Sequence, residues 1–128
     1  MDHGISILIV DDELSVRDSL YNWFIEDGYT VECAEDAKKA LSILESQDFD
    51  IILADIKMPG MDGMEMLRRI KSIKKDSIVI MMTAFATVDT AVQALKEGAF
   101  DYVTKPFDPD DLTPVSYTHL TLPTIYSV

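Results

Sequence analysis

Three near-continuous apolar runs constrain the fold of this chain more than any other feature of its sequence. They are SILIV at 6–10, DIILA at 50–54 and SIVIMM at 77–82. Unbroken apolar strands are typical of parallel sheets that are covered on both faces. Two shorter runs, TVECA at 30–34 and DYVT at 101–104, are expected nearer the edges of the sheet.

Helical patterns separate these strands. Apolar residues recur at i, i+3, i+4 and i+7 between them, which is the stripe of an amphipathic helix. Gly28 and Gly98 stand where helix ends are expected. The alternation predicts an α/β fold, a doubly wound five-stranded parallel sheet with right-handed crossovers. The helices are expected at about 14–27, 37–44, 63–73 and 88–95, with a last one starting at 108–112.

Composition narrows the class of protein further. The 128 residues fit one domain, and no apolar run approaches the roughly 20 residues of a membrane span. We read no export signal at the N-terminus, and the single cysteine, Cys33, allows no internal disulfide, so a cytoplasmic location is expected. The net charge of −12 argues against nucleic-acid contact through phosphates by this piece.

The last sixteen residues differ from the rest of the chain. Residues 113–128 contain no Asp, Glu, Lys or Arg, although 27% of the chain is charged. A flexible linker is one interpretation, but VSYTHLTLPT at 115–124 matches, residue for residue, the translation of a transposon-end adaptor used in sequencing libraries. We therefore expect one domain over 1–112, incomplete at its last helix, and a non-native tail over 113–128.

Polar residues with related chemistry follow the predicted strands. Asp11 and Asp12 follow the first, Asp55 the third, Thr83 the fourth and Lys105 the fifth. In open α/β sheets the carboxyl ends of the strands meet at one edge, where ligands bind. Three carboxylates there repel one another unless a cation intervenes, and few hard oxygen ligands suit Mg²⁺. With a lysine and a hydroxyl to hold a phosphoryl group, Asp55 becomes a candidate nucleophile.

Each of these residues also has a purely structural interpretation. Asp11 and Asp12 fit a turn and helix cap, and Asp55 fits a strand end before a Pro-Gly turn. Thr83 fits a strand, and Lys105 a solvated surface. The coincidence of suitable groups at four strand ends favours a site.

Three stretches together resemble the receiver domain of two-component response regulators. They are ILIVDDE, DIILADIKMPGMDGMEML and IVIMMTAFATVDTAVQALKEGAFDYVTKPFD, and the resemblance spreads over residues 5 to about 112. The resemblance implies a flavodoxin-like fold with strand order 2-1-3-4-5. The sequence from Met82 to Phe107 looks most like that of receivers in bacterial enhancer-binding transcription activators. A phosphoprotein that controls an attached output domain is therefore expected.

The resemblance also implies a role for each site residue. Asp55 would accept a phosphoryl group from a sensor histidine kinase. Mg²⁺ would be bound by Asp12, Asp55 and the main-chain carbonyl of Lys57, with Asp11 helping through water. Lys105 would contact the phosphoryl group.

Switching is expected to involve Thr83 and Tyr102. Thr83 would hydrogen-bond the phosphoryl group, and Tyr102 would turn inward and change the face formed by the fourth helix, fifth strand and fifth helix. A complete chain could form a homodimer through that face. The resemblance further implies a cis Lys105–Pro106 bond, and a bulky Phe85 near Lys57 predicts slow autodephosphorylation.

Two other functions remain as alternatives. An aspartate-nucleophile phosphohydrolase expects a second Asp two places after Asp55, where this chain has Lys57. A degenerate, phosphate-independent binding module would not need the full set of acids, hydroxyl and lysine. We expect a switch that catalyses only its own phosphorylation and dephosphorylation. A calcium loop is excluded, since Lys57 and Pro59 occupy places that need oxygen ligands.

Overall fold

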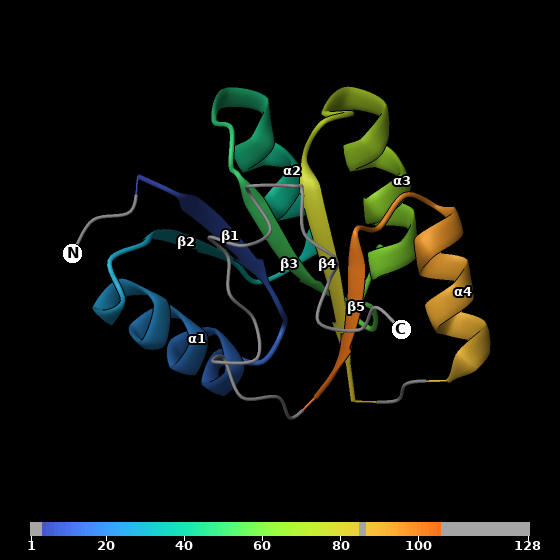
Figure 1. Cartoon of the computed structure of the whole chain (residues 1–128), viewed down its shortest axis with the longest axis horizontal. Helices are drawn as coiled ribbons and strands as arrows, with labels where there is room; N and C mark the ends of the chain where they lie inside the picture. The colour runs from blue at the N-terminus through green and yellow to red at the C-terminus, as the bar shows by residue number, and fades with distance from the viewer. Residues whose placement is uncertain (1–3, 85–86, 106–128) are drawn as a thin grey trace.

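The computed structural model describes residues 4–84 and 87–105, and its centre is one parallel sheet (Figure 1). The five strands lie in the order β2-β1-β3-β4-β5, and every neighbouring pair is parallel. This confirms the predicted fold class and strand order. The strands are β1 Ser6–Val10, β2 Thr30–Ala34, β3 Ile51–Asp55, β4 Ile78–Thr83 and β5 Asp101–Thr104.

A helix follows each of the first four strands. They are α1 Leu14–Glu26, α2 Ala37–Ser46, α3 Gly63–Ile73 and α4 Val88–Lys96. Gly28 and Gly98 follow α1 and α4 with φ of 97° and 107°, a left-handed conformation that glycine adopts without a steric penalty. Both helix ends therefore lie where the sequence predicts them.

Two strand boundaries differ from the prediction. β3 and β4 each begin and end one residue later than expected, so Asp55 and Thr83 are the last residues of their strands. Asp55 is still in register with Met82, and Thr83 with Thr104. The apolar run does not mark the end of a strand because ladder hydrogen bonds join main-chain groups, whatever side chain each residue carries.

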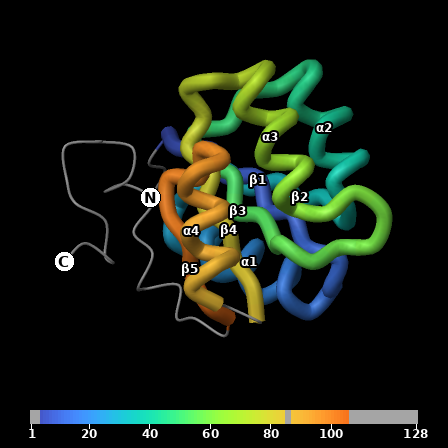
Figure 2. The backbone as a smooth tube through the Cα atoms, turned by 90° about the vertical axis from the view of Figure 1, so that its right-hand side faces the viewer, coloured from blue at the N-terminus to red at the C-terminus, as the bar shows by residue number. Residues whose placement is uncertain are grey.

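The helices cover the two faces of the sheet unequally. On one face α2, α3 and α4 bury Leu44, Leu67 and Ala94 against the even-numbered residues of β1 and β3 and the odd-numbered residues of β4. On the other face α1 buries Leu20 and Phe24 against the odd-numbered residues of β1 and β3. Figure 2 shows α4 beside β5 at the near edge, with α2 and α3 lying together beyond it. Each central strand is therefore buried on both sides, as its apolar run predicts.

The helices also differ in how they begin. Asp36, Asp62 and Thr87 cap α2, α3 and α4, and each side chain accepts a hydrogen bond from a main-chain N–H three residues on. Glu13 occupies the same position at α1 but makes no side-chain cap bond. The start of α1 therefore lacks the stabilisation that the other three helices have.

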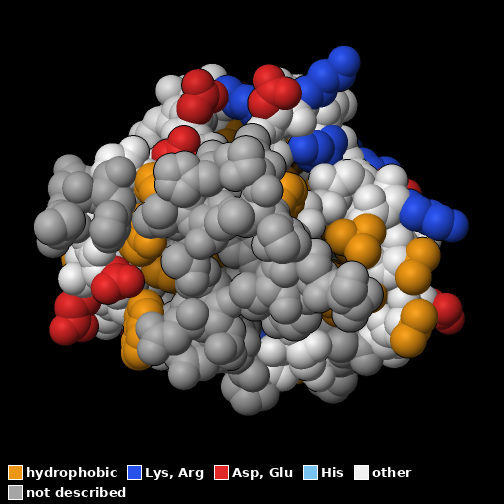
Figure 3. Space-filling model, viewed as in Figure 1, with side chains coloured by type: hydrophobic (Ala, Val, Ile, Leu, Met, Phe, Trp, Pro, Cys, Tyr) orange, Lys and Arg blue, Asp and Glu red, His pale blue; other side chains and the backbone are white. Residues whose placement is uncertain are grey.

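Helix α4 is the least buried of the four. Only Ala94 of its nine residues is buried, while Val88, Val92 and Leu95 are exposed. Figure 3 shows hydrophobic side chains at the surface on the side where α4 lies. The described residues contain no helix long and apolar enough to cross a membrane.

Several predictions fall on residues outside the described ranges. These are the helix expected from 108–112, the tail at 113–128, the cis Lys105–Pro106 bond and the role of Phe85. They stay predictions.

Candidate functional site

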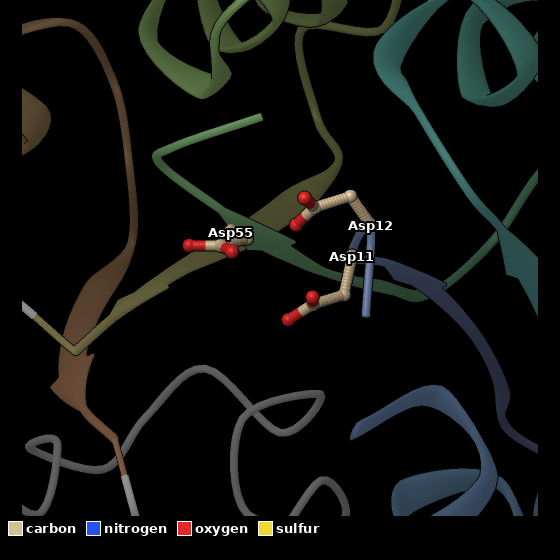
Figure 4. Close-up of side chains that lie close together, drawn as sticks. All are labelled: Asp11, Asp12 and Asp55. Atoms are coloured by element: carbon tan, nitrogen blue, oxygen red, sulfur yellow. The ribbon is translucent and has the colours of Figure 1, made fainter. Parts of the chain in front are cut away.

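Three carboxylates meet at the carboxyl edge of the central strands. Asp55 ends β3, and Asp11 and Asp12 follow β1 directly, so neighbouring parallel strands deliver all three to one place. One carboxylate oxygen from each lies within 4.8 Å of the others, and Figure 4 shows the side chains projecting into the same space. Asp11 and Asp55 are buried, whereas Asp12 is exposed. The pocket therefore opens to solvent at Asp12.

Lys105 supplies a positive charge to this pocket. Its ammonium nitrogen lies 2.5 Å from Asp11 Oδ2 and 3.2 Å from Asp55 Oδ2. Its side chain is only 12% exposed, so both contacts lie in a partly desolvated place. One cation thus bridges two of the three acids across 94 and 50 residues of sequence.

The burial of these groups changes their protonation. Desolvation raises the pKa of Asp55 above its ordinary value, and repulsion from Asp11 adds to this, although the charge of Lys105 opposes both. Burial by itself would lower the pKa of Lys105, but the hydrogen bond to Asp11 and the charges of Asp11 and Asp55 outweigh it and raise that pKa. Lys105 therefore keeps its positive charge, whereas Asp55 ionises less readily than an exposed aspartate.

The remaining predicted site residues lie around this cluster. Thr83 is buried at the end of β4, the strand next to β3. The Lys57 main-chain N–H donates to Asp55 Oδ1 at 3.3 Å, and the Lys57 side chain is exposed. Tyr102 lies on β5, in register with Met81, and is half-buried. All seven predicted residues are described, and six of them belong to the strand ends or to the loops that follow; Tyr102 lies within its strand.

Tyr102 contacts a residue that the sequence analysis missed. Its hydroxyl lies 2.8 Å from Thr90 Oγ1, and Thr90 belongs to the capping box that starts α4 with Thr87. The signal was present in the sequence as two threonines three residues apart at the start of an amphipathic helix. The structure thus links Tyr102 to the first turn of α4.

Gly63 was also missed, although it lies directly behind Asp55. A Cβ atom at Gly63 would lie 2.3 Å from the main-chain oxygen of Asp55 and 2.7 Å from Ile56 Cα. The Gly63 N–H donates to the Ile56 carbonyl at 2.7 Å. The start of α3 therefore packs against the backbone of the candidate nucleophile, at a distance that only glycine allows.

Arg17 is the third residue that the sequence analysis missed. It lies on α1, half-buried, and its Nη1 donates to the main-chain oxygen of Asp11 at 2.7 Å. A lone arginine one turn into a helix reads as an ordinary surface residue, so no sequence pattern could have singled it out.

The fold and the site together define a class of protein. It is an α/β domain with a buried aspartate, two acids and a lysine at the carboxyl edge of its sheet, a set suited to phosphoryl chemistry with a hard cation. The response regulator receiver domain family matches residues 7–115. Because this match covers most of the chain, the protein belongs to that family, as the sequence analysis expected.

Curated relatives agree in sequence. The chain is 48% identical over 106 residues to the regulatory protein AtoC of Escherichia coli, a match that covers 83% of this chain and 23% of AtoC. It is 42% identical over 111 residues to the DNA-binding transcriptional regulator NtrC of Salmonella typhimurium, covering 87% and 24%. These enhancer-binding activators are the subfamily that the sequence predicts. The chain spans about a quarter of their length.

Solved structures agree in fold. A receiver domain from Methanospirillum hungatei superposes with a TM-score of 0.84 at 35% identity, covering 91% of this chain and 93% of that one. TrrA of Thermotoga maritima, solved with Mg²⁺ and beryllofluoride, gives 0.79 at 34%, covering 89% and 98%. The beryllofluoride-activated NtrC4 receiver dimer gives 0.81 at 34%, covering 90% and 93%. The chain is a signalling receiver of this family.

Proposed function

We propose that Asp55 is the phosphoacceptor of a signalling switch that a sensor histidine kinase drives. The observation that carries this proposal is the pocket itself, in which Asp11, Asp12 and Asp55 converge with Lys105 at one strand edge. Family membership supports the same role, since receivers accept phosphoryl groups from histidine kinases. We also propose, by analogy with the longer relatives, that the switch controls an attached output domain that regulates transcription.

The chemistry follows from the positions of the side chains. A carboxylate oxygen of Asp55 attacks the phosphorus of a phosphohistidine, the phosphorus–nitrogen bond breaks, and the imidazole leaves and takes up a proton. Lys105, 3.2 Å from Asp55 Oδ2, is positioned to stabilise the charge on the transferring oxygens. Burial raises the pKa of Asp55, and the positive charge of Lys105 opposes this change and so favours the ionised, nucleophilic carboxylate.

The three acids fit a magnesium ion. Their oxygens are hard ligands that lie within 4.8 Å of one another on a solvent-open side, where water would supply the remaining ligands. Asp12 and Asp55 would bind directly, with the Lys57 carbonyl, and Asp11 through water. When bound, Mg²⁺ supplies charge neutralisation to the phosphoryl oxygens. TrrA, the similar receiver solved with Mg²⁺, supports this assignment.

The switch is proposed to run from Thr83 to Tyr102 and α4. Thr83 would hydrogen-bond the phosphoryl group, and Tyr102 would turn inward into the space this leaves. That rotation would break the 2.8 Å contact between the Tyr102 hydroxyl and Thr90, at the cap of α4. The exposed face of α4 and β5 would change as a result. In a complete chain this face could form a homodimer, which the NtrC4 receiver dimer supports.

Two alternative functions are less well supported. A phosphohydrolase needs a second acid two places after the nucleophile, and Lys57 stands there. A phosphate-independent binding module has no use for a buried acid whose pKa is raised, which costs stability when the acid ionises. We infer a cytoplasmic switch with no free substrate, acting on an output domain and without direct nucleic-acid contact by this piece.

Intact mass spectrometry tests the proposal. The purified chain is incubated with acetyl phosphate, with and without Mg²⁺, and one phosphate adduct is expected only with Mg²⁺. Asp55→Asn should abolish the adduct, because an amide cannot form the acyl phosphate. Asp62→Asn is the matched control, an acid in the same loop that caps α3 instead. An adduct that survives in Asp55→Asn would refute the assignment.

A further inference from the structure

Arg17 reaches from α1 to the end of β1, where the acidic pocket begins. Its Nη1 donates to the main-chain oxygen of Asp11 at 2.7 Å, and the bond is partly buried. Arg17 contacts no carboxylate of the pocket within ion-pair distance among the described residues. Its contact with the site is therefore made through the backbone.

The hydrogen bond from Arg17 is one of four that hold Asp11 in place. The Asp11 N–H donates to the Ala34 carbonyl at 3.2 Å, and its carboxylate accepts from the Glu13 N–H at 2.9 Å and from Lys105 at 2.5 Å. The main-chain oxygen of Asp11 is the last polar group of the residue, and Arg17 is its donor. Every polar atom of Asp11 thus has a partner, and a side chain from α1 supplies one of them.

Fixing the Asp11 carbonyl also fixes the residue that follows. The carbonyl of Asp11 and the N–H of Asp12 belong to one rigid peptide plane, so holding the oxygen holds the orientation of the bond that leads to Asp12 Cα. Asp12 is exposed, and α1 begins two residues later with no side-chain cap. In this short junction the Arg17 side chain ties the first turn of α1 to the residue that follows β1.

We propose that Arg17 is a positioning residue for the metal pocket, acting through the Asp11–Asp12 peptide to aim the Asp12 carboxylate. The inference rests on the Mg²⁺ role proposed above. Outer groups that orient metal ligands typically change metal affinity by tenfold or more when removed.

Arg17 also carries a charge, and its two effects on Mg²⁺ affinity have opposite signs. A cation near the pocket repels Mg²⁺, so removing the charge alone would tighten binding. Losing the hold on the Asp11 carbonyl would weaken binding, because Asp12 would no longer be aimed at the ion. The sign of the change therefore separates positioning from electrostatics.

The experiment is a Mg²⁺ titration of the full chain followed by ¹H–¹⁵N NMR, with Arg17→Met and Arg17→Lys beside the parent. Lysine keeps the charge, but its side chain ends one bond earlier and cannot put its donor where Nη1 lies. Positioning predicts a Kd for Mg²⁺ about tenfold higher in Arg17→Met and a rise at least as large in Arg17→Lys, which loses the contact but keeps the repulsive charge. Arg68→Met, which removes an equal charge from α3, should leave the Kd at the parent value.

Three results would overturn the inference. A tighter Kd in Arg17→Met with an unchanged Kd in Arg17→Lys would mean that the charge alone acts. An unchanged Kd in both Arg17→Met and Arg17→Lys, with both variants folded, would mean that the contact is only structural. If Arg17→Met does not fold, Arg17→Lys decides, and a parent-like Kd there refutes positioning. Absence of saturable Mg²⁺ binding by the parent itself would instead refute the proposed function, and this inference with it.

Discussion

The junction between β1 and α1 differs from the junction between β3 and α3, although both carry acids of the same pocket. Only Asp11, Asp12 and Glu13 separate β1 from α1. The loop from Ile56 to Asp62 is longer, and it ends in a residue whose carboxylate accepts from the Glu65 N–H at 2.9 Å. The longer junction separates the phosphoacceptor from the helix cap.

This difference shows that a short junction leaves no separate residue to cap the helix. In the β3–α3 junction Asp55 serves the pocket and Asp62 serves the helix. In the β1–α1 junction both aspartates face the pocket, and Glu13 makes no cap bond. Helix α1 is therefore joined to its strand by the Arg17 contact and by burial of Leu20 and Phe24. At that junction the two aspartates contribute to the pocket, and no side chain caps the helix.

Gly63→Ala should produce the largest effect on stability. The added Cβ would lie 2.3 Å from the Asp55 main-chain oxygen, so the backbone of α3 or β3 must shift. We expect a loss of about 3 kcal/mol, at the upper end for overpacking. Gly60→Ala in the same loop meets no atom within 4 Å but has φ of 81°, so it should cost only about 1 kcal/mol. Urea unfolding of both variants measures the ratio, and equal losses would contradict the close packing.

Asp62→Ala and Glu13→Ala test the caps directly. Removing the Asp62 carboxylate leaves the Glu65 N–H without its acceptor and should cost about 1 kcal/mol of unfolding free energy. Glu13→Ala should cost less than about 0.5 kcal/mol, because it makes no cap bond and only a distant, exposed contact with Lys105. Chemical denaturation compares the two. A Glu13→Ala loss as large as that of Asp62→Ala would break the comparison between the junctions.

The smallest effect concerns the pH dependence of Asp55. Its folded pKa lies above the unfolded value of 3.8, so the folded state binds more protons between the two values, and stability falls as pH rises through that window. Above it, ionised Asp55 destabilises the metal-free protein. Asp55→Asn cannot ionise, so its Tm without Mg²⁺ should exceed that of the parent at pH 7.

Thermal unfolding across pH tests this sign. The difference in Tm between Asp55→Asn and the parent should vanish below about pH 3.8, where both side chains are neutral. Asp62→Asn is the control, since its carboxylate is at an exposed helix cap. A lower Tm for Asp55→Asn at pH 7 without Mg²⁺ would mean that the attraction of Lys105 outweighs burial.

Much of the site was predictable because strand ends are local. Asp11, Asp12, Asp55, Thr83 and Lys105 are each adjacent to an apolar run, and a parallel sheet brings its carboxyl ends together. What the sequence could not separate was which acids serve the pocket and which serve a helix. Asp36 and Asp62 are caps, whereas Asp11 makes a turn bond with the Glu13 N–H before α1 and neither Asp11 nor Asp12 caps that helix.

The sequence by itself determined the sheet, its helices and the edge where the acids collect, since these follow from hydrophobic periodicity along the chain. Only the tertiary structure decided that Gly63 packs on the Asp55 backbone, that Thr90 meets Tyr102 and that Arg17 holds the Asp11 carbonyl. These contacts join separate elements at short range. Their geometry depends on how helices pack on the sheet, and no local pattern of residues records it.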